Sequence, residues 1–454
     1  MFHKQQSPLA TTGRSPAQRR AKRNLILVLL ESTFAYGVLS MPIMTLFFTE
    51  EIGLSFGEIA MTQSIFTIVT IFMNAPLGLL ADCISRKWVN IIGDFGLGII
   101  HLFYAMTQNI GGVIACEILL GVFGAMSKGV DISLIHHFNK QMGGAEESAS
   151  IRRGRFIRIN SNLQICQNIF NMILMVLGGI IGAIDYRLAI ALSAIGYLIG
   201  ATIELFVQDD SKRMQSGIGA DLRRNLAKLR RSFKEPGLVS KLKFIFACFA
   251  LVLRTAYAPF LKTIQFTGGA LKDKLLSSRM FAVAICRQIG HGLIWIYSPM
   301  LIMVGLPKEL LGFGWVFTSL ANILGAALAK RYALKMSMRR IVAIGSLMSL
   351  FAIFVMFIDL NIFTMPLYFL ISAGLGWFSA AMPPHVQEAS SEESQATVAS
   401  LTSTGGSIIY AITGWIIGCF ADSALQVALL VNFVIFAPLC LFAYLYLRRY
   451  DKVE

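Results

Sequence analysis

Apolar runs of about 20 residues recur along the whole chain, and they limit its fold more than any other feature. An α-helix needs about this length to cross the ~30 Å hydrocarbon core of a bilayer. Of the 454 residues, 56% are hydrophobic and only 14% are charged, whereas soluble proteins carry charge on roughly 25% of their residues. Alternating segments of strand length are missing, which argues against an outer-membrane barrel. The sequence therefore predicts an all-α polytopic membrane protein.

The apolar runs divide into twelve expected transmembrane helices, with ends uncertain by a few residues. Their ranges are 24–48, 59–81, 88–107, 111–131, 157–184, 188–206, 281–304, 310–329, 340–358, 363–383, 395–420 and 424–447.

The Lys and Arg residues indicate how the helices are oriented. The net charge is +15, and it lies in alternate connecting segments, as expected for cytoplasmic loops rather than for a nucleic-acid-binding surface. We therefore expect a multi-pass protein of the plasma membrane (the inner membrane of a bacterium) with both termini cytoplasmic. The basic segments are 1–23, 83–87, 139–158, 207–243, 330–340 and 448–452.

One further apolar stretch, 244–261, has basic residues on both flanks. A single crossing would place one of these flanks outside, so an interfacial or re-entrant helix is favoured, with a thirteenth span as the alternative. The basic segment "LRRNLAKLRRSFKE" before it is amphipathic and suits the inner surface. The expected division is a basic tail, an N-terminal six-helix bundle, a central cytoplasmic segment, a C-terminal six-helix bundle and a second tail, at 1–23, 24–206, 207–280, 281–447 and 448–454.

The two halves of the chain resemble each other. "EES" occurs at 146–148 and again at 392–394, in the loops before the fifth and eleventh spans. "GGIIGAID" ends the fifth span, and "GWIIGCFAD" ends the eleventh. A duplicated helical membrane protein with a long central loop is typical of a transporter whose site lies between its halves.

The loop between the second and third spans carries Gly78, Asp82, Arg86 and Lys87. It resembles the signature loop of the major facilitator superfamily, roughly G-x-x-x-D-x-x-G-R-K/R, with Ser85 in place of the second glycine. Such a loop acts as a latch, because Asp82 can pair with the basic residues and face the positive N-terminus of a neighbouring helix. Anchoring by the positive-inside rule is the alternative, but it leaves Asp82 unexplained.

Two further segments extend the resemblance. "EESQATVAS" is similar to the family's loop before the eleventh span. "GAMSKGVDISLIHHF" resembles a subgroup of bacterial exporters and related carriers, with His136 and His137 in place of that subgroup's Tyr-Asp pair. The resemblance covers nearly the whole chain except 244–280. It implies two pseudo-symmetric bundles of six helices, with the fifth span lining a central cavity.

Amide side chains form a stripe along one face of the fifth span. Such a face cannot point into lipid without leaving its donors and acceptors unsatisfied. We interpret it as a wall of the substrate cavity; a hydrogen-bonded seam between helices is the alternative. The stripe contains Asn160, Gln164, Gln167, Asn168 and Asn171, of which the last four are taken as cavity candidates.

Charged residues within the first and seventh spans are candidates for a function, because each is costly to place in hydrocarbon. Glu31 and Arg287 lie at equivalent positions of the repeat and could pair across the cavity. Glu31 is the leading candidate for proton coupling; the alternative is a hydrated, inert carboxylate. His291 and Asp131 are further proton candidates, and Arg287 and Tyr36 are further cavity candidates. Asp94 in the third span is expected to support the latch loop.

The chain contains no nucleotide, zinc-protease or nucleophile-elbow motif, and its cysteines form no C-x-x-C pair. We therefore predict no enzyme, cofactor or metal site. The expected function is secondary active transport of a small organic solute by alternating access, proton-coupled, as an antiporter for efflux of a drug, metabolite or siderophore, by a monomer. The alternatives are a facilitator, an importer of a nutrient or metal-chelate, and a membrane receptor without transport.

The predicted topology can be tested by cysteine labelling. In intact cells, Arg230→Cys in a cysteine-free background should not react with an impermeant maleimide, because 207–280 is expected inside. Asn109→Cys, in an expected outside loop, is the positive control. Ready labelling at position 230 would overturn the topology.

Overall fold

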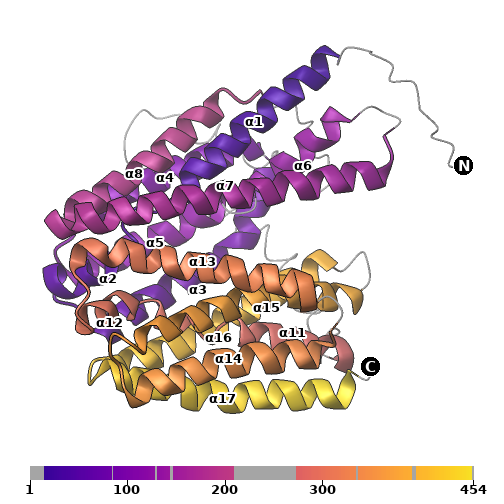
Figure 1. The fold of residues 1–454 in the computed structure, drawn as a ribbon. Coiled ribbons are helices and arrows are strands. Elements are labelled where there is room, and N and C mark those ends of the chain that lie inside the picture. The colour runs from indigo at the N-terminus through magenta and orange to yellow at the C-terminus, as the bar shows by residue number, and fades with distance from the viewer. Residues whose placement is uncertain are drawn as a thin grey trace, which may run out of the picture.

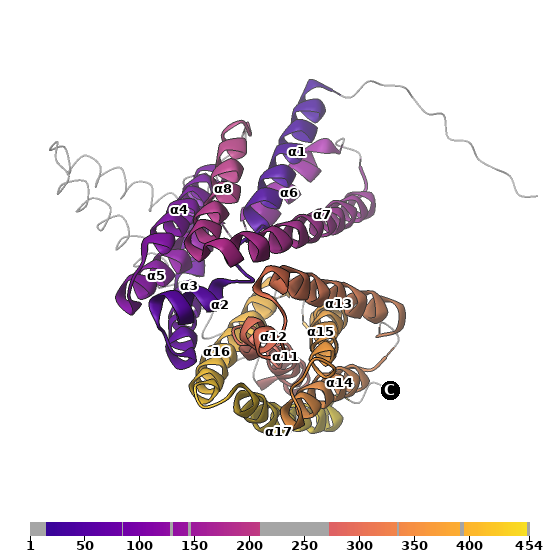
Figure 2. The same ribbon diagram turned by 60° about the vertical axis from the view of Figure 1, so that its left-hand side comes forward.

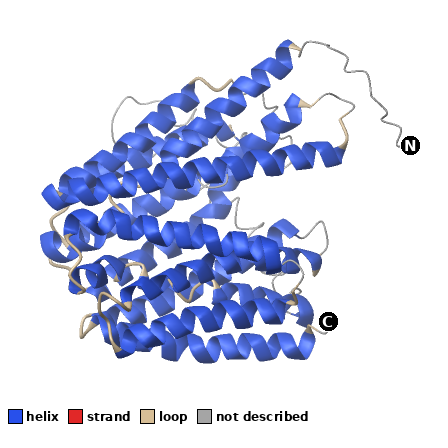
Figure 3. Cartoon of the chain, in the orientation of Figure 1, coloured by secondary structure: helices blue, strands red, loops and turns tan. Residues whose placement is uncertain are grey.

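The computed structural model describes residues 15–83, 85–127, 130–143, 147–208, 272–333, 336–390 and 395–451. Every regular element in these ranges is helical (Figure 3). The stretch 244–261 and the amphipathic segment before it lie outside the described residues.

The N-terminal half comprises the first set of helices (Figure 1). They are α1 (Pro16–Tyr36), α2 (Met44–Leu46), η1 (Phe47–Ile52), α3 (Phe56–Cys83), α4 (Arg86–Met106), α5 (Ile110–Ser127), α6 (Val130–Met142), α7 (Ala149–Ile184) and α8 (Tyr186–Leu205).

The C-terminal half comprises the second set, which packs as a separate group in Figure 2. Its elements are α11 (Lys274–Cys286), η2 (His291–Leu293), α12 (Tyr297–Met303), η3 (Lys308–Leu310), α13 (Leu311–Tyr332), α14 (Met338–Ile358), η5 (Met365–Leu367), α15 (Tyr368–Glu388), α16 (Gln395–Ala421) and α17 (Leu425–Tyr450).

Ten helices among the described residues are long and apolar enough to cross a membrane, and α11 with α12 forms an eleventh candidate bent by 43°. Helix α1, followed by α2 and η1, occupies the predicted first span but is not among these candidates. The predicted fold class, two bundles of six crossing segments, is confirmed. The sequence did not predict α6, which follows α5.

The first and seventh spans are broken helices, so the prediction of continuous spans at 24–48 and 281–304 was wrong. The first helix stops at Tyr36 before Gly37, and α11 stops at Cys286. Side chains from other helices bind the exposed backbone: Asn171 accepts from the Val38 N–H at 3.2 Å, and Asn432 donates to the Ile289 carbonyl at 3.0 Å. Broken helices at equivalent places in two repeats are a feature of transporter binding sites.

The α1 helix begins earlier than its apolar run, at Pro16. Ser15 and Gln18 form a reciprocal capping box there, which satisfies the first amides of the helix. Residues 16–23, expected as tail, are therefore helical and continuous with the first span.

The two halves converge at one end and diverge toward the end where both chain termini lie (Figure 1). We call these the closed end and the terminal end. Helices α7 and α13 cross between the halves, and glycines permit the close approach: a Cβ atom at Gly312 would lie 2.2 Å from the Met175 carbonyl oxygen. The crossing therefore brings the two backbones into direct contact.

Polar contacts reinforce the closed end. The Lys308 Nζ lies 2.5 Å from a Glu50 carboxylate oxygen and 2.7 Å from the Tyr186 hydroxyl. Asp422 of the C-terminal half accepts from the Phe56 N–H at 2.6 Å, at the start of α3. Among the described residues, every hydrogen bond or ion pair between the halves lies in the part nearer the closed end.

Gly312→Ala should open the closed end, because its Cβ cannot fit against the Met175 carbonyl. In a cysteine-free background, spin labels at Ile184 and Phe363, both exposed, should move apart as the population shifts. Gly124→Ala is the matched control, since a Cβ there meets nothing within 4 Å. Unchanged distance distributions in Gly312→Ala would show that this crossing does not maintain closure.

Candidate functional site

A cavity of about 460 Å³ lies between the halves. Three elements line it: α3 of the N-terminal half, and α11 with its following break and α16 of the C-terminal half. The volume falls within the usual range for small-molecule sites. The lining residues are Phe66, Thr67, Thr70, Ile71, Asn74, Val283, Ala284, Arg287, Gln288, His291, Ser400, Thr402, Ser403, Thr404, Gly406, Ser407 and Tyr410.

The lining is polar and carries positive charge. Arg287 has no carboxylate beside it among the described lining residues. The His291 Nδ1 lies 3.1 Å from the Arg287 carbonyl oxygen and must donate to it, so a neutral ring presents Nε2 as an acceptor. Thr67 and Thr70 donate to carbonyls of their own helix, which leaves their oxygens available to accept. The arrangement suits a solute with acceptor or anionic groups.

An aromatic pair separates the cavity from the closed end. The Trp295 Nε1 donates to the Tyr410 hydroxyl at 2.9 Å, and Phe48 packs against Trp295 with ring centroids 6.3 Å apart. Just beyond, Ser64 of α3 donates to the Ala411 carbonyl of α16 at 2.8 Å. Because the Phe48–Trp295 and Ser64–Ala411 contacts join the two halves, they would have to break for the cavity to open at the closed end.

The amide stripe of the fifth span does not line this cavity. Gln167 donates to the Ser32 carbonyl at 2.9 Å, and Asn171 bonds Val38, so both join α7 to the first span. This is the interhelical seam that the sequence left as the alternative. Gln164 is exposed and Asn168 half-buried, and neither forms a hydrogen bond with a described residue. Tyr36 is exposed at the end of α1.

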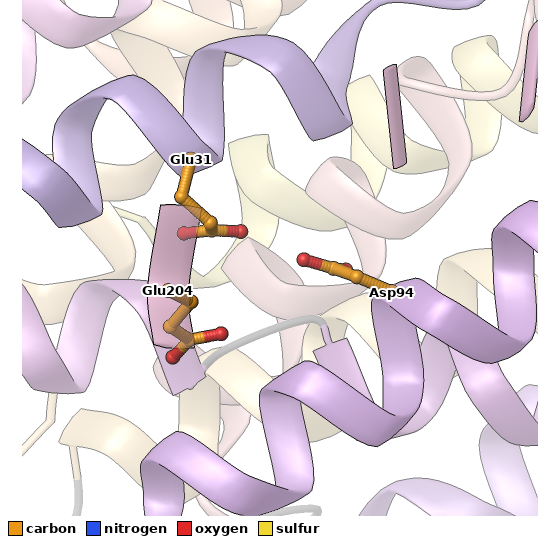
Figure 4. Close-up of side chains that lie close together, drawn as sticks. All are labelled: Glu31, Asp94 and Glu204. Atoms are coloured by element: carbon orange, nitrogen blue, oxygen red, sulfur yellow. The ribbon is translucent and has the colours of Figure 1, made fainter. Parts of the chain in front are cut away.

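Three carboxylates lie together inside the N-terminal half, on α1, α4 and α8 (Figure 4). Oxygens of Glu31, Asp94 and Glu204 lie within 4.8 Å of one another, and all three residues are 0% exposed. Asn90 donates to Glu31 at 3.3 Å and to Glu204 at 2.9 Å. We call these three residues the acidic cluster.

The acidic cluster cannot hold three negative charges without compensation, because close buried carboxylates repel one another strongly. A proton, a hard cation or a basic side chain near the cluster would relieve the repulsion. The predicted partner Arg287 is elsewhere: it lines the cavity in the C-terminal half and forms no ion pair with Glu31. In this conformation, therefore, the expected Glu31–Arg287 pair is not formed.

The predicted latch residues lie at the end of α3 and the start of α4. Lys87 donates to the Leu205 carbonyl at 2.8 Å and to the Val207 carbonyl at 2.6 Å, so it ties α4 to the end of α8 within one half. Such carbonyls at a helix C-terminus attract cations. Gly78 is exposed near the end of α3, and Arg86 begins α4. The side chains of Asp82 and Asp131 lie outside the described residues.

Sequence reasoning missed several residues. Glu204 lies in the last turn of α8, inside the predicted span 188–206, but the sequence analysis did not single it out. Asp94 was assigned to support of the latch, whereas the structure places it beside Glu31. The Ser and Thr residues of "SLTSTGGS" in α16 were a visible signal, but such residues also occur in membrane helices bonded to their own backbone.

The sequence matches the model of the Major Facilitator Superfamily over residues 25–283. The chain therefore belongs to this family. No curated protein matches the sequence.

Solved transporters share the fold. A mutant of the nucleoside transporter NupG superimposes with a TM-score of 0.67 at 13% identity, covering 95% of this chain and 100% of that one. A bacterial homologue of the human lysosomal transporter Spinster, inward-facing and unoccupied, gives 0.67 at 14% identity, over 97% and 99%. PepTSo2 gives 0.60 at 12% identity, over 96% and 98%.

Asp94→Asn should raise the melting temperature at pH 8, by roughly 2–4 °C, the shift that ~1 kcal/mol produces in a domain of about 200 residues. The amide removes one charge from the cluster and can donate to Glu31. The gain should shrink at pH 5, where protons already relieve the repulsion in the unmodified protein. Glu309→Gln, an exposed acid, is the control. A lower melting temperature of Asp94→Asn at both pH values would show that the Asp94 carboxylate stabilises the cluster.

Proposed function

We propose that the protein is a secondary active carrier that moves a small organic solute by alternating access. The observation that carries the proposal is the polar cavity between two halves whose described mutual contacts lie toward the closed end. A site between two repeats that meet at one end can be exposed to each side in turn when the halves rock.

The lining favours a solute that carries an anionic or strongly accepting group. Arg287 and Gln288 offer donors, and the only lining charge among the described residues is positive. An anionic group of the solute would therefore be favourably placed beside Arg287. We propose export, supported by the resemblance of 124–138 to bacterial exporters. Under the expected topology, the terminal end is cytoplasmic and this conformation is the inward-facing one.

Proton coupling is proposed at the acidic cluster. Glu31 lies on α1, and α8 approaches α1 closely there, since a Cβ at Gly196 would lie 2.7 Å from the Phe34 carbonyl oxygen. Beyond the break, the Pro42 carbonyl accepts from Ser298 of the C-terminal half at 2.6 Å. A change in charge at the cluster can thus bias the packing of α1, and through it a contact at the closed end.

The function can be tested once sensitivity profiles of a deletion strain and its parent have identified a solute. In proteoliposomes, a pH gradient should drive accumulation of that solute by the unmodified protein. Glu31→Gln should abolish gradient-driven accumulation but keep exchange of labelled for unlabelled solute, because exchange need not move protons. Arg287→Gln should impair both reactions.

Glu309→Gln provides the control for the loss of a carboxylate, since it is exposed and remote from the acidic cluster. Full gradient-driven accumulation by Glu31→Gln would remove the coupling role. Equilibration of the solute without accumulation, whatever the pH gradient, would point to a facilitator.

A further inference from the structure

An apolar groove runs along the outer face of the C-terminal half, between α14 and α17, with a volume of about 540 Å³. Both helices lie at the edge of the molecule farthest from the N-terminal half (Figures 1 and 2). Leu347 and Phe351 line it and are 69% and 58% exposed, while Ala343 and Ala437 leave room between the larger side chains. The groove is therefore separate from the cavity between the halves.

A second depression, of about 860 Å³, adjoins the groove at the terminal end. It contains Arg279, Arg339 and Arg340, and we call it the arginine pocket. The groove and the pocket share Ala343 and Tyr444, so they form one continuous depression, apolar along the membrane and charged at its end.

Only part of the charge in the arginine pocket is already paired. The guanidinium of Arg279 lies 3.0 Å from the Asp451 carboxylate and donates to the His385 carbonyl at 2.6 Å. Glu388 lies beside the His385 ring, at 3.9 Å. The Asp451 carboxylate is thus paired within the protein, whereas the Glu388 side chain is largely exposed.

Arg339 and Arg340 are not paired in this way. Neither forms a hydrogen bond or ion pair with a described residue, and the Nε of Arg339 is buried without an acceptor. A buried donor without an acceptor is costly, which indicates that an acceptor belongs here. Both residues lie in the first turn of α14, whose cap residue Ser337 makes no side-chain bond to the helix. The exposed amides of such a turn also attract anions.

The dimensions match one leaflet of a bilayer. The lining of α14 runs from Ala343 through Leu347 and Phe351 to Phe354. The 11 steps between the first and last of these residues give a rise of about 16 Å. This is half of the ~30 Å hydrocarbon core. An acyl chain that enters at the headgroup level would fill the groove as far as the middle of the membrane.

We propose that this depression binds one anionic phospholipid of the leaflet at the terminal end. Its phosphate contacts Arg339, Arg340 and the first turn of α14, and one acyl chain lies between α14 and α17. Basic pockets between membrane helices bind anionic headgroups in this way. The inference needs only that the chain is embedded in a membrane, so it stands apart from the proposed transport reaction.

Native mass spectrometry of the purified full chain in detergent tests the site. The unmodified protein should bind one phosphatidylglycerol about tenfold or more tighter than phosphatidylcholine. Arg339→Gln/Arg340→Gln should bind the two lipids equally. Arg331→Gln/Arg448→Gln removes the same number of charges near the terminal end but outside the pocket, and should keep the preference. Ala437→Phe fills the groove and should weaken binding of both lipids.

Glycerol phosphate, the headgroup without acyl chains, gives a second measurement that needs no variant. Glycerol phosphate should bind about a hundredfold or more weakly than phosphatidylglycerol, because the acyl chain of the lipid contributes most of the buried apolar area. Equal affinity for the two lipids, or an unchanged preference in the Arg339/Arg340 double variant, would overturn the proposal. Glycerol phosphate or inorganic phosphate binding as tightly as the lipid would also overturn it and indicate a soluble-anion site.

Discussion

The direct contact of two helix backbones at the α7–α13 crossing is the constraint on which the architecture depends. Gly179 and Gly312 remove the side chains that would hold these helices apart, so the two halves can meet at the closed end. The Lys308–Glu50 and Asp422–Phe56 contacts then fix their relative position. Because the halves diverge from this end, the polar faces of α3, α11 and α16 are left to line a cavity.

The breaks in the first and seventh spans follow from the same geometry. Backbone groups within a bilayer must be satisfied, and here Asn171, Ser193 and Asn432 bond the carbonyls and amides that the breaks expose. Each break thus depends on partners more than 100 residues away in the sequence. A local pattern cannot reveal such partners, which is why both spans were predicted as continuous helices.

The architecture, by contrast, could be predicted from the sequence. Crossing a membrane requires a length and an apolarity that are visible within each span alone. The site was less accessible. Arg287 and His291 were selected because ionisable side chains within a membrane span are costly and usually functional. The structure shows that both line the cavity. Glu31 was selected for the same reason, but its neighbours Asp94 and Glu204 lie 63 and 173 positions away. Only helix packing brings these carboxylates together, so the sequence favoured a partner across the cavity instead.

The separation of the acidic cluster from Arg287 restricts how the proposed coupling can work. Proton and solute cannot compete for one side chain if the carboxylates lie inside the N-terminal half and the solute binds in the cavity. Coupling must then pass through a change in helix packing. The first span carries Glu31 on α1 and, beyond its break, the Pro42–Ser298 contact with the C-terminal half at the closed end. Weakening the Pro42–Ser298 contact alone should therefore uncouple proton movement from solute movement. Ser298→Ala is expected to keep solute exchange while lowering the accumulation that a pH gradient supports. Equal loss of exchange and accumulation would indicate that Ser298 serves closure rather than coupling.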